Sequence, residues 1–192
     1  MKLIKGLFTF IGAIVVIGAI IAAVTIGPKV AKLDAQALPE YIKMFDKVLT
    51  TGDAARAMIR RVKVDADVSN QDVEEALESI ATERGIKPVG ILPLSDEIEA
   101  RTGKKRGMIK IFSYCNPITA GKFVDYSMAF GAFLPCRIAL IEDKNGDRYL
   151  YAMAMELMIE GGYWLESPML EEANKVRSTI YDMMDMAAKG DF

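Results

Sequence analysis

Residues 134–153, with the sequence LPCRIALIEDKNGDRYLYAM, decide the fold of this chain. Residues 134–141 and 148–153 are rich in the branched and aromatic side chains that favour strands. Asn145-Gly146 lies between them, and this dipeptide favours the positive backbone angles of a hairpin turn. The stretch therefore predicts two antiparallel strands joined by a tight turn.

Other segments supply the helices and strands that would surround this hairpin. Ser69 and Asp72 have the spacing of a capping box, with Asp in place of the usual Glu, and predict the start of a helix. The remaining expected elements are strands at 58–64, 87–92 and 108–114, a helix from 117, and a long helix capped by Ser167-Pro168 and running through 188. The order strand, helix, two strands, helix, hairpin, helix predicts an α+β fold, a small sheet covered by helices on one face.

An apolar run of 22 residues, 6–27, precedes this domain and contains no Asp, Glu, Lys or Arg. As a helix it would span ~33 Å, which matches the ~30 Å hydrocarbon core of a bilayer. A cleavable signal peptide has a shorter apolar region of ~7–15 residues, and Ala-Gln-Ala at 35–37 would be a late cleavage site. We therefore predict a retained N-terminal transmembrane helix within residues 1–28.

Basic residues flank the apolar run on both sides, with Lys2 and Lys5 before it and Lys29 and Lys32 after it. Because these charges nearly balance, the positive-inside rule gives only a weak preference. A short leader before a single span tends to stay in the cytoplasm. We therefore expect a bacterial inner-membrane protein with its C-terminal domain on the periplasmic side.

A stalk at residues 29–57 follows the anchor and leads into the α+β domain at 58–192. Its apolar residues recur at helical spacing and indicate an amphipathic helix of about three turns, with Leu38, Tyr41, Ile42, Phe45, Val48 and Leu49 on one side. The basic residues of this helix are only Lys43 and Lys47. Since membrane-surface helices are rich in basic residues, we expect this helix to dock on the domain instead.

Charge and composition exclude several classes of function. The chain has 24 basic and 26 acidic side chains, and a net charge of −2 without a broad basic field disfavours nucleic-acid binding. It contains no histidine, which excludes Ser-His-Asp and Cys-His catalysis as well as zinc and haem sites that need histidine. We predict no catalytic residue and no metal site, and the sequence specifies no cofactor.

Two short motifs flank the helix expected from residue 117: Tyr-Cys-Asn-Pro at 114–117 and Leu-Pro-Cys-Arg-Ile at 134–138. As a pair, followed by an acidic Gly-containing turn, they resemble the domain-of-unknown-function 302 family over residues 59–187. The resemblance implies a compact α+β domain, often exported or membrane-attached, that tends to form homodimers. The family has no established activity, so only the motif positions transfer, as a candidate thiol or ligand site: Cys115, Asn116, Pro117, Pro135, Cys136 and Arg137.

The two cysteines allow three interpretations. Asn116-Pro117 places Cys115 just before a helix, where unpaired amide groups would stabilise a thiolate, and Arg137 adds a positive charge beside Cys136. Both cysteines also lie in phase with apolar strand positions, which favours the second interpretation, small hydrophobic side chains in the core. A disulfide is the third, and it requires antiparallel strands, since parallel strands would separate the cysteines along the sheet.

These features predict a membrane-anchored binding or accessory module that acts as an oligomeric subunit. Its expected partners are the membrane through residues 6–27, a second copy of the chain and other membrane proteins. The alternative is a thiol-based redox or sulfur-handling protein that uses Cys115 and Cys136.

Retention of the anchor is directly testable. The length of the uncharged run at 6–27 exceeds that of a signal peptide, so we expect the purified protein to keep its N-terminal helix. Intact-mass analysis of protein extracted from membranes measures this. A mature N-terminus at Leu38, behind the late cleavage site, would contradict the prediction.

Overall fold

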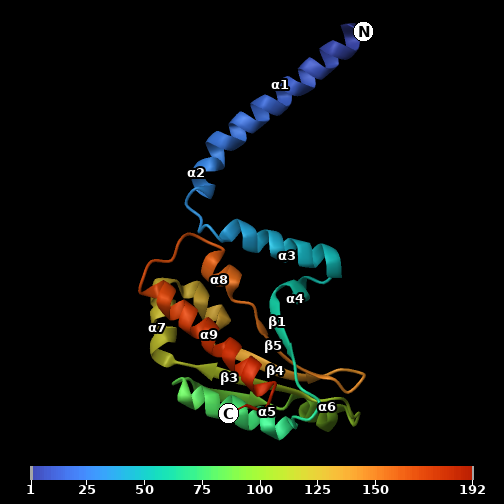
Figure 1. Ribbon diagram of the computed structural model, residues 1–192, viewed down its shortest axis with the longest axis vertical. Helices are drawn as coiled ribbons and strands as arrows, with labels where there is room; N and C mark the ends of the chain where they lie inside the picture. Colours follow the sequence, from blue (N-terminus) through green and yellow to red (C-terminus); the bar gives the residue numbers. More distant parts are fainter. Residues whose placement is uncertain (1, 192) are drawn as a thin grey trace.

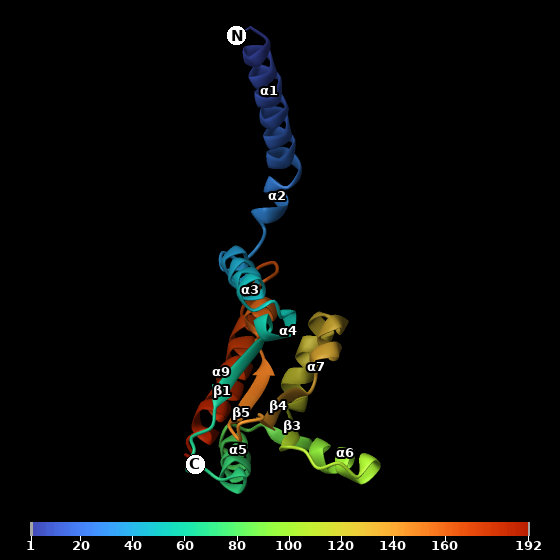
Figure 2. The ribbon, with the colours of Figure 1, turned by 90° about the vertical axis from the view of Figure 1, so that its right-hand side faces the viewer.

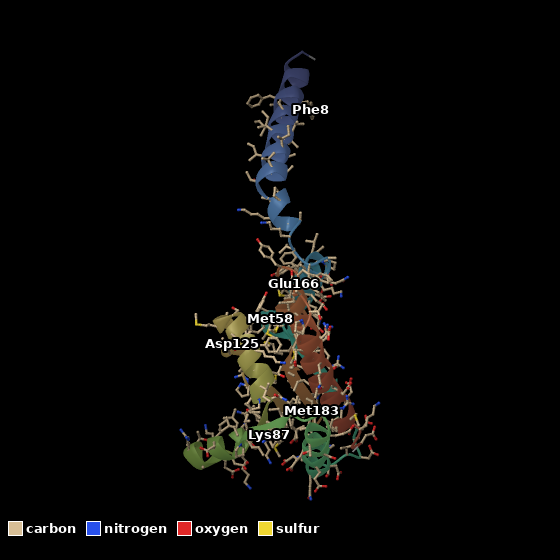
Figure 3. All side chains as sticks on the ribbon, turned by 90° about the vertical axis from the view of Figure 1, so that its left-hand side faces the viewer. Phe8, Met58, Lys87, Asp125, Glu166 and Met183 are labelled. Carbon is tan, nitrogen blue, oxygen red and sulfur yellow. The ribbon has the colours of Figure 1, made fainter. Side chains whose placement is uncertain are left out.

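The computed structural model of the chain describes the backbone of residues 2–191 and the side chains of residues 6–8 and 10–191. Its first element, α1 (Lys2–Thr25), projects away from the rest of the chain (Figure 1). The segment Gly6–Thr25 is long and apolar enough to cross a membrane, as membrane anchors and signal sequences both are. Its described side chains are exposed over the whole circumference of the helix, as Figure 3 shows around Phe8.

Three further helices connect α1 to the domain: α2 (Gly27–Val30), α3 (Ala37–Thr51) and α4 (Ala54–Ala57). α3 lies across one end of the domain (Figure 1) and packs on α4 and on α8 (Glu156–Glu160). The side of α3 that meets the domain carries buried Ala37 and half-buried Met44 and Val48. Most of its apolar stripe, which we expected to dock on the domain, faces away from it.

The domain is built on one five-stranded sheet in the order β1-β5-β4-β3-β2, with every neighbouring pair antiparallel. Its strands are β1 (Ile59–Lys63), β2 (Lys87–Leu92), β3 (Ile109–Cys115), β4 (Cys136–Glu142) and β5 (Arg148–Met153). The sheet and its surrounding helices confirm the expected α+β fold. The expected hairpin strands, β4 and β5, lie in the interior of the sheet, and β1 and β2 form its edges.

One face of the sheet is covered by α5 (Asn70–Glu83) and α9 (Met169–Ala187), which lie side by side (Figures 1 and 2). The sheet contributes alternate residues to this face, because successive side chains of a strand point to opposite sides. The fully buried core includes Leu77, Ile80, Ile138, Leu140, Leu150, Ile180 and Met183. The helices α6 (Leu94–Thr102), which projects from the body in Figure 2, and α7 (Pro117–Tyr126) flank the sheet.

Local sequence signals explain most of the helix and turn boundaries. Ser69 Oγ accepts a hydrogen bond from Asp72 N at 3.1 Å, and Asp72 Oδ2 accepts one from Ser69 N at 2.8 Å, so the capping box is formed. In the β4–β5 turn only Gly146 takes a positive φ, +83°, whereas Asn145 does not. Asp143 Oδ1 explains this difference, because it accepts from Asn145 N and Asp147 N and builds a wider turn than a two-residue hairpin.

The start of the last helix differs from the prediction. α9 begins at Met169, and Ser167 does not cap it, because the Ser167 hydroxyl donates to the Glu171 carboxylate instead. Other short helices were also not expected, among them α4 on the stalk. Within the domain these are α8 and the 3-10 helix η1 (Met128–Phe133), which leads into β4. Both lie at the end of the sheet that carries the candidate site.

Candidate functional site

The two sequence motifs meet at one end of the sheet. β3 and β4 are antiparallel, and their register sets Tyr114 opposite Cys136. Cys115 is the last residue of β3, and Cys136 is the first residue of β4. The question that the sequence left open, whether these strands are parallel or antiparallel, is therefore answered in favour of the arrangement that brings the motifs together.

The two cysteines nevertheless point to opposite faces of the sheet. Cys136 shares its face of the sheet with buried Ile138 and Leu140. Tyr114 of β3 lies opposite Cys136, so the next residue, Cys115, points to the other face. Both thiols are half-buried and free. The structure thus has the antiparallel strands that a disulfide requires, but it directs the side chains apart.

Asn116 and Pro117 form the start of α7. Asn116 Oδ1 accepts hydrogen bonds from Ile118 N at 3.1 Å and Thr119 N at 3.2 Å, and its Nδ2 donates to Gly85 O. Pro117 occupies the first turn, where its missing N–H is not needed. Because the Asn116 side chain occupies these two amide groups, they are not free to stabilise a thiolate at Cys115.

Cys136 lies in surroundings that oppose ionisation. The pKa of its thiol is raised from 9.0 to about 11, mainly by burial and to a smaller extent by nearby Cys115, whereas Arg137 lowers it. Arg137 is exposed on the opposite face of β4 from Cys136, because adjacent residues of a strand point to opposite faces. The Cys136 side chain is therefore a neutral thiol at neutral pH and behaves as an apolar group.

An apolar cavity of ≈ 380 Å³ lies beside Cys136, and we call it the inner cavity. Pro135, Cys136 and Arg137 line it, whereas Cys115, Asn116 and Pro117 do not. The rest of its wall includes residues of β1, β3, β5, α7, η1, α8 and α9. These side chains are mainly aromatic, aliphatic and sulfur-containing, among them Phe123, Phe130, Phe133, Met153, Met155, Met158, Ile159 and Val176. A cavity of this size and lining is typical of a site for a small molecule.

A second, wider cavity of ≈ 790 Å³, the outer cavity, lies between α3 and the domain. It shares wall residues with the inner cavity, namely Ile59, Phe130, Phe133, Met153 and Met158. Met58, labelled in Figure 3, also lies on its wall. Unlike the inner cavity, it is lined by charged side chains of both signs: Glu40, Lys43, Asp46, Lys47, Arg60 and Glu156.

A group of polar side chains joins β1, α8 and α9 at the outer cavity. The Tyr181 hydroxyl donates to the Glu156 carboxylate at 3.0 Å and accepts from Met155 N at 3.1 Å. Burial raises the pKa of Tyr181 to about 12, so its hydroxyl keeps its proton and remains a donor. Arg60 Cζ lies 4.5 Å from the centroid of the Tyr181 ring, and Arg60 Nη2 lies 2.7 Å from Asp185 Oδ2.

Sequence reasoning found only part of this site. It singled out the segment at 134–138, which lines the inner cavity, but it did not connect Arg60, Glu156 and Tyr181 with it. The methionines at 153, 155 and 158 lie close together in the sequence, but methionine commonly fills apolar cores, and this explanation is favoured over a binding site when only the sequence is considered. Among the residues that the structure describes, no group of three Cys, Asp or Glu side chains is arranged to hold a metal ion.

The fold defines an antiparallel α+β domain with an apolar cavity at one end of its sheet, preceded by an apolar helix. A family model described as "Domain of unknown function DUF302" matches residues 61–187, and the chain belongs to this family. The crystal structure of an uncharacterized conserved DUF302 protein from Bacillus stearothermophilus has a similar fold, with a TM-score of 0.56 and 17% identity. The similarity covers 68% of this chain and 98% of that one. The comparison with curated proteins gives no match.

The raised pKa of Cys136 predicts slow alkylation. Because the pKa rises from 9.0 to about 11, the thiolate fraction at a pH of about 8 falls by about a hundredfold relative to the unfolded chain. Iodoacetamide labelling of the Cys115→Ser variant, with and without denaturant, measures this ratio for Cys136 alone. The Cys136→Ser variant provides the matched control.

The same shift has a consequence for stability. A thiol whose pKa is raised on folding stabilises the native state below about pH 9 and loses this contribution as the pH rises towards 11. Labelling of native Cys136 as fast as in denaturant at neutral pH would contradict both statements and favour a reactive thiol.

Proposed function

We propose that this chain is a membrane-anchored binding module for an amphipathic small molecule. Residues 6–27 hold it in the membrane, with the domain on the periplasmic side. The apolar part of the ligand occupies the inner cavity and its polar end occupies the outer cavity.

The observation that carries the proposal is the shared wall of the two cavities. Phe130, Phe133 and Met158 line both, so a single elongated molecule in contact with these side chains would reach both compartments. The inner cavity offers mainly carbon and sulfur atoms, with Arg137 and Tyr151 as its polar side chains. The apolar portion of a ligand gains ~25 cal/mol for each Å² that it buries against such a wall.

The charges of the outer cavity indicate the kind of polar end. Three basic and three acidic side chains line it: Lys43, Lys47, Arg60, Glu40, Asp46 and Glu156. This balance favours a neutral or zwitterionic group with hydrogen-bonding atoms over a strongly anionic one. The buried Nε of Arg60 has no hydrogen-bond partner among the described residues, which favours a polar end that offers a hydrogen-bond acceptor.

The thiol-based alternative has less support. Cys136 is held in its neutral form by burial, and the amide groups behind Cys115 are used by Asn116. Binding in the cavity requires neither thiolate. We therefore favour the binding module over redox or sulfur-handling chemistry.

Filling the inner cavity should abolish ligand binding. Ala139 is half-buried and lines this cavity, so Ala139→Phe removes space without removing a polar group. We expect photolabelling of the detergent-solubilised chain by a diazirine analogue of hexadecanol, a neutral amphiphile, to fall about tenfold, equivalent to ~1.4 kcal/mol of binding free energy.

The matched control is Ala100→Phe on α6, where the alanine is exposed and lines neither cavity. Thermal unfolding of both variants checks that the fold is kept, and peptide mapping places the adduct. Equal labelling of both variants, or adducts found only in α1, would refute the cavity as the site.

We also propose that two copies of the chain associate through the region of β2. This edge strand leaves Val89, Ile91 and Leu92 exposed, which is unusual for a sheet edge in contact with water. Pro88 lacks an N–H group, and the strand is bulged between Pro88 and Gly90, so the sheet does not simply continue into a second copy. Contact through side chains is therefore expected. β5 lies between β1 and β4, so it needs no cover from a second copy.

Disruption of this contact has a clear readout. Ile91→Lys places a charge in the apolar patch, and we expect it to convert a dimer in detergent into a monomer in light scattering corrected for bound detergent. Met128→Lys, at a still more exposed apolar side chain on η1, should leave the dimer intact. A wild-type chain that is strictly monomeric would contradict the proposal.

A further inference from the structure

The outward side of α3 carries a continuous apolar stripe. Leu38, Tyr41, Ile42, Phe45 and Leu49 follow helical spacing on this side, and they are 45–69% exposed. Complete burial of such side chains is worth ~1.5–3 kcal/mol each. A stripe of this size has a substantial driving force to find an apolar partner.

Packing against the domain fixes the direction of this stripe. Ala37 is buried, Met44 and Val48 are half-buried, and Gly52 ends the helix with a φ of +66°. Asp34 holds the first turn in place, because its carboxylate accepts from Gln36 N at 2.8 Å and its backbone oxygen accepts from Ala37 N. α3 therefore presents its stripe as part of the folded domain.

A second exposed apolar feature lies beside the start of α3. Leu33 forms an antiparallel bridge with Tyr163, and Asp34 N donates to Gly162 O at 2.9 Å, so the 161–164 loop is tied to the segment before α3. Tyr163 and Trp164 are 59% and 58% exposed. Tyrosine and tryptophan are enriched where a protein meets the headgroup region of a bilayer.

The chain connects this patch to the membrane span over a short distance. α1 ends at Thr25 and α3 begins at Ala37, with α2 between them, and Figure 1 shows α3 lying across the domain at the end nearest α1. The connection from Val30 to Ala37 extends over at most ~25 Å. A domain held by α1 therefore carries its apolar patch close to the surface of the same bilayer.

We propose that α3 and Tyr163-Trp164 form a second membrane contact, which lies in the headgroup region of the bilayer that α1 spans. Burial of apolar side chains drives this contact. The nearby Lys43 and Lys47 are accompanied by Glu40 and Asp46, so attraction to anionic lipid is not its basis. Neutral phosphatidylcholine is therefore sufficient as a surface.

This membrane contact would also set where the outer cavity lies relative to the bilayer. The consequence for ligand entry rests on the proposed binding function. Glu40, Met44 and Lys47 of α3 line that cavity from the inner side of the helix. A docked α3 places the cavity at the level of the lipid headgroups. An amphipathic ligand then enters from the membrane without first crossing bulk water.

Trp164 is the single tryptophan of the chain and reports on the contact directly. The full chain is placed in phosphatidylcholine nanodiscs, and Trp164 fluorescence is quenched by brominated phosphatidylcholine or by aqueous iodide. We expect strong quenching by the brominated lipid and protection from iodide. In Phe45→Glu the lipid quenching should fall about threefold or more, because a carboxylate in the stripe opposes insertion.

The matched control is Ile118→Glu, at an exposed apolar residue on α7 that lies outside the patch. It should leave the quenching unchanged. A chain that remains in the nanodisc but shows free access of iodide to Trp164 would overturn the second contact. Protection from both quenchers would also overturn it, because a second copy or another protein would then cover the patch.

The photolabelling of the inner cavity by the hexadecanol analogue in detergent does not depend on contact between α3 and a membrane. Loss of that labelling with intact lipid quenching of Trp164 would refute the binding function alone. Intact labelling without lipid quenching would refute the membrane contact alone.

Discussion

The antiparallel pairing of β3 with β4 is the constraint on which the rest of the domain depends. Its register sets Phe112 opposite Ile138 and Tyr114 opposite Cys136, so alternate residues of both strands face α5 and α9. A slip of one residue would move this apolar set to the open face and replace it with Arg137 and its neighbours. The same pairing brings two motifs on either side of α7 to one end of the sheet.

The cavities follow from the way the chain enters and leaves that end. η1 leads into β4, and β5 leads out into α8, so short helices instead of a long one cover the strand ends. Protein interiors are packed to a density of ~0.74, and unfilled apolar volume lowers stability. The space of ≈ 380 Å³ between these short helices and the strand ends is left unfilled by side chains and is open to solvent on one side. Half-buried Tyr181 donates its hydroxyl to Glu156, and its raised pKa of about 12 keeps that hydroxyl protonated at neutral pH.

The sequence by itself determined the features that depend on neighbours along the chain. The apolar run at 6–27, the Ser69–Asp72 capping box and the α+β order of elements all follow from periodicity or cap chemistry acting over a few residues. Local rules were wrong in detail where another side chain offered a competing hydrogen bond. Glu171 takes the Ser167 hydroxyl that would have capped α9, and the Asp143 carboxylate widens the turn around Asn145.

Only the tertiary structure decided what depends on elements far apart in the chain. Whether β3 and β4 are antiparallel, and which face each cysteine occupies, depends on how α7 returns the chain to the sheet. The Arg60–Asp185 pair joins positions 125 residues apart, and no local pattern signals it. The outward direction of the apolar stripe on α3 is likewise decided by tertiary packing. Helical spacing defines which residues share a face, but what that face meets is set by the packing of the whole domain.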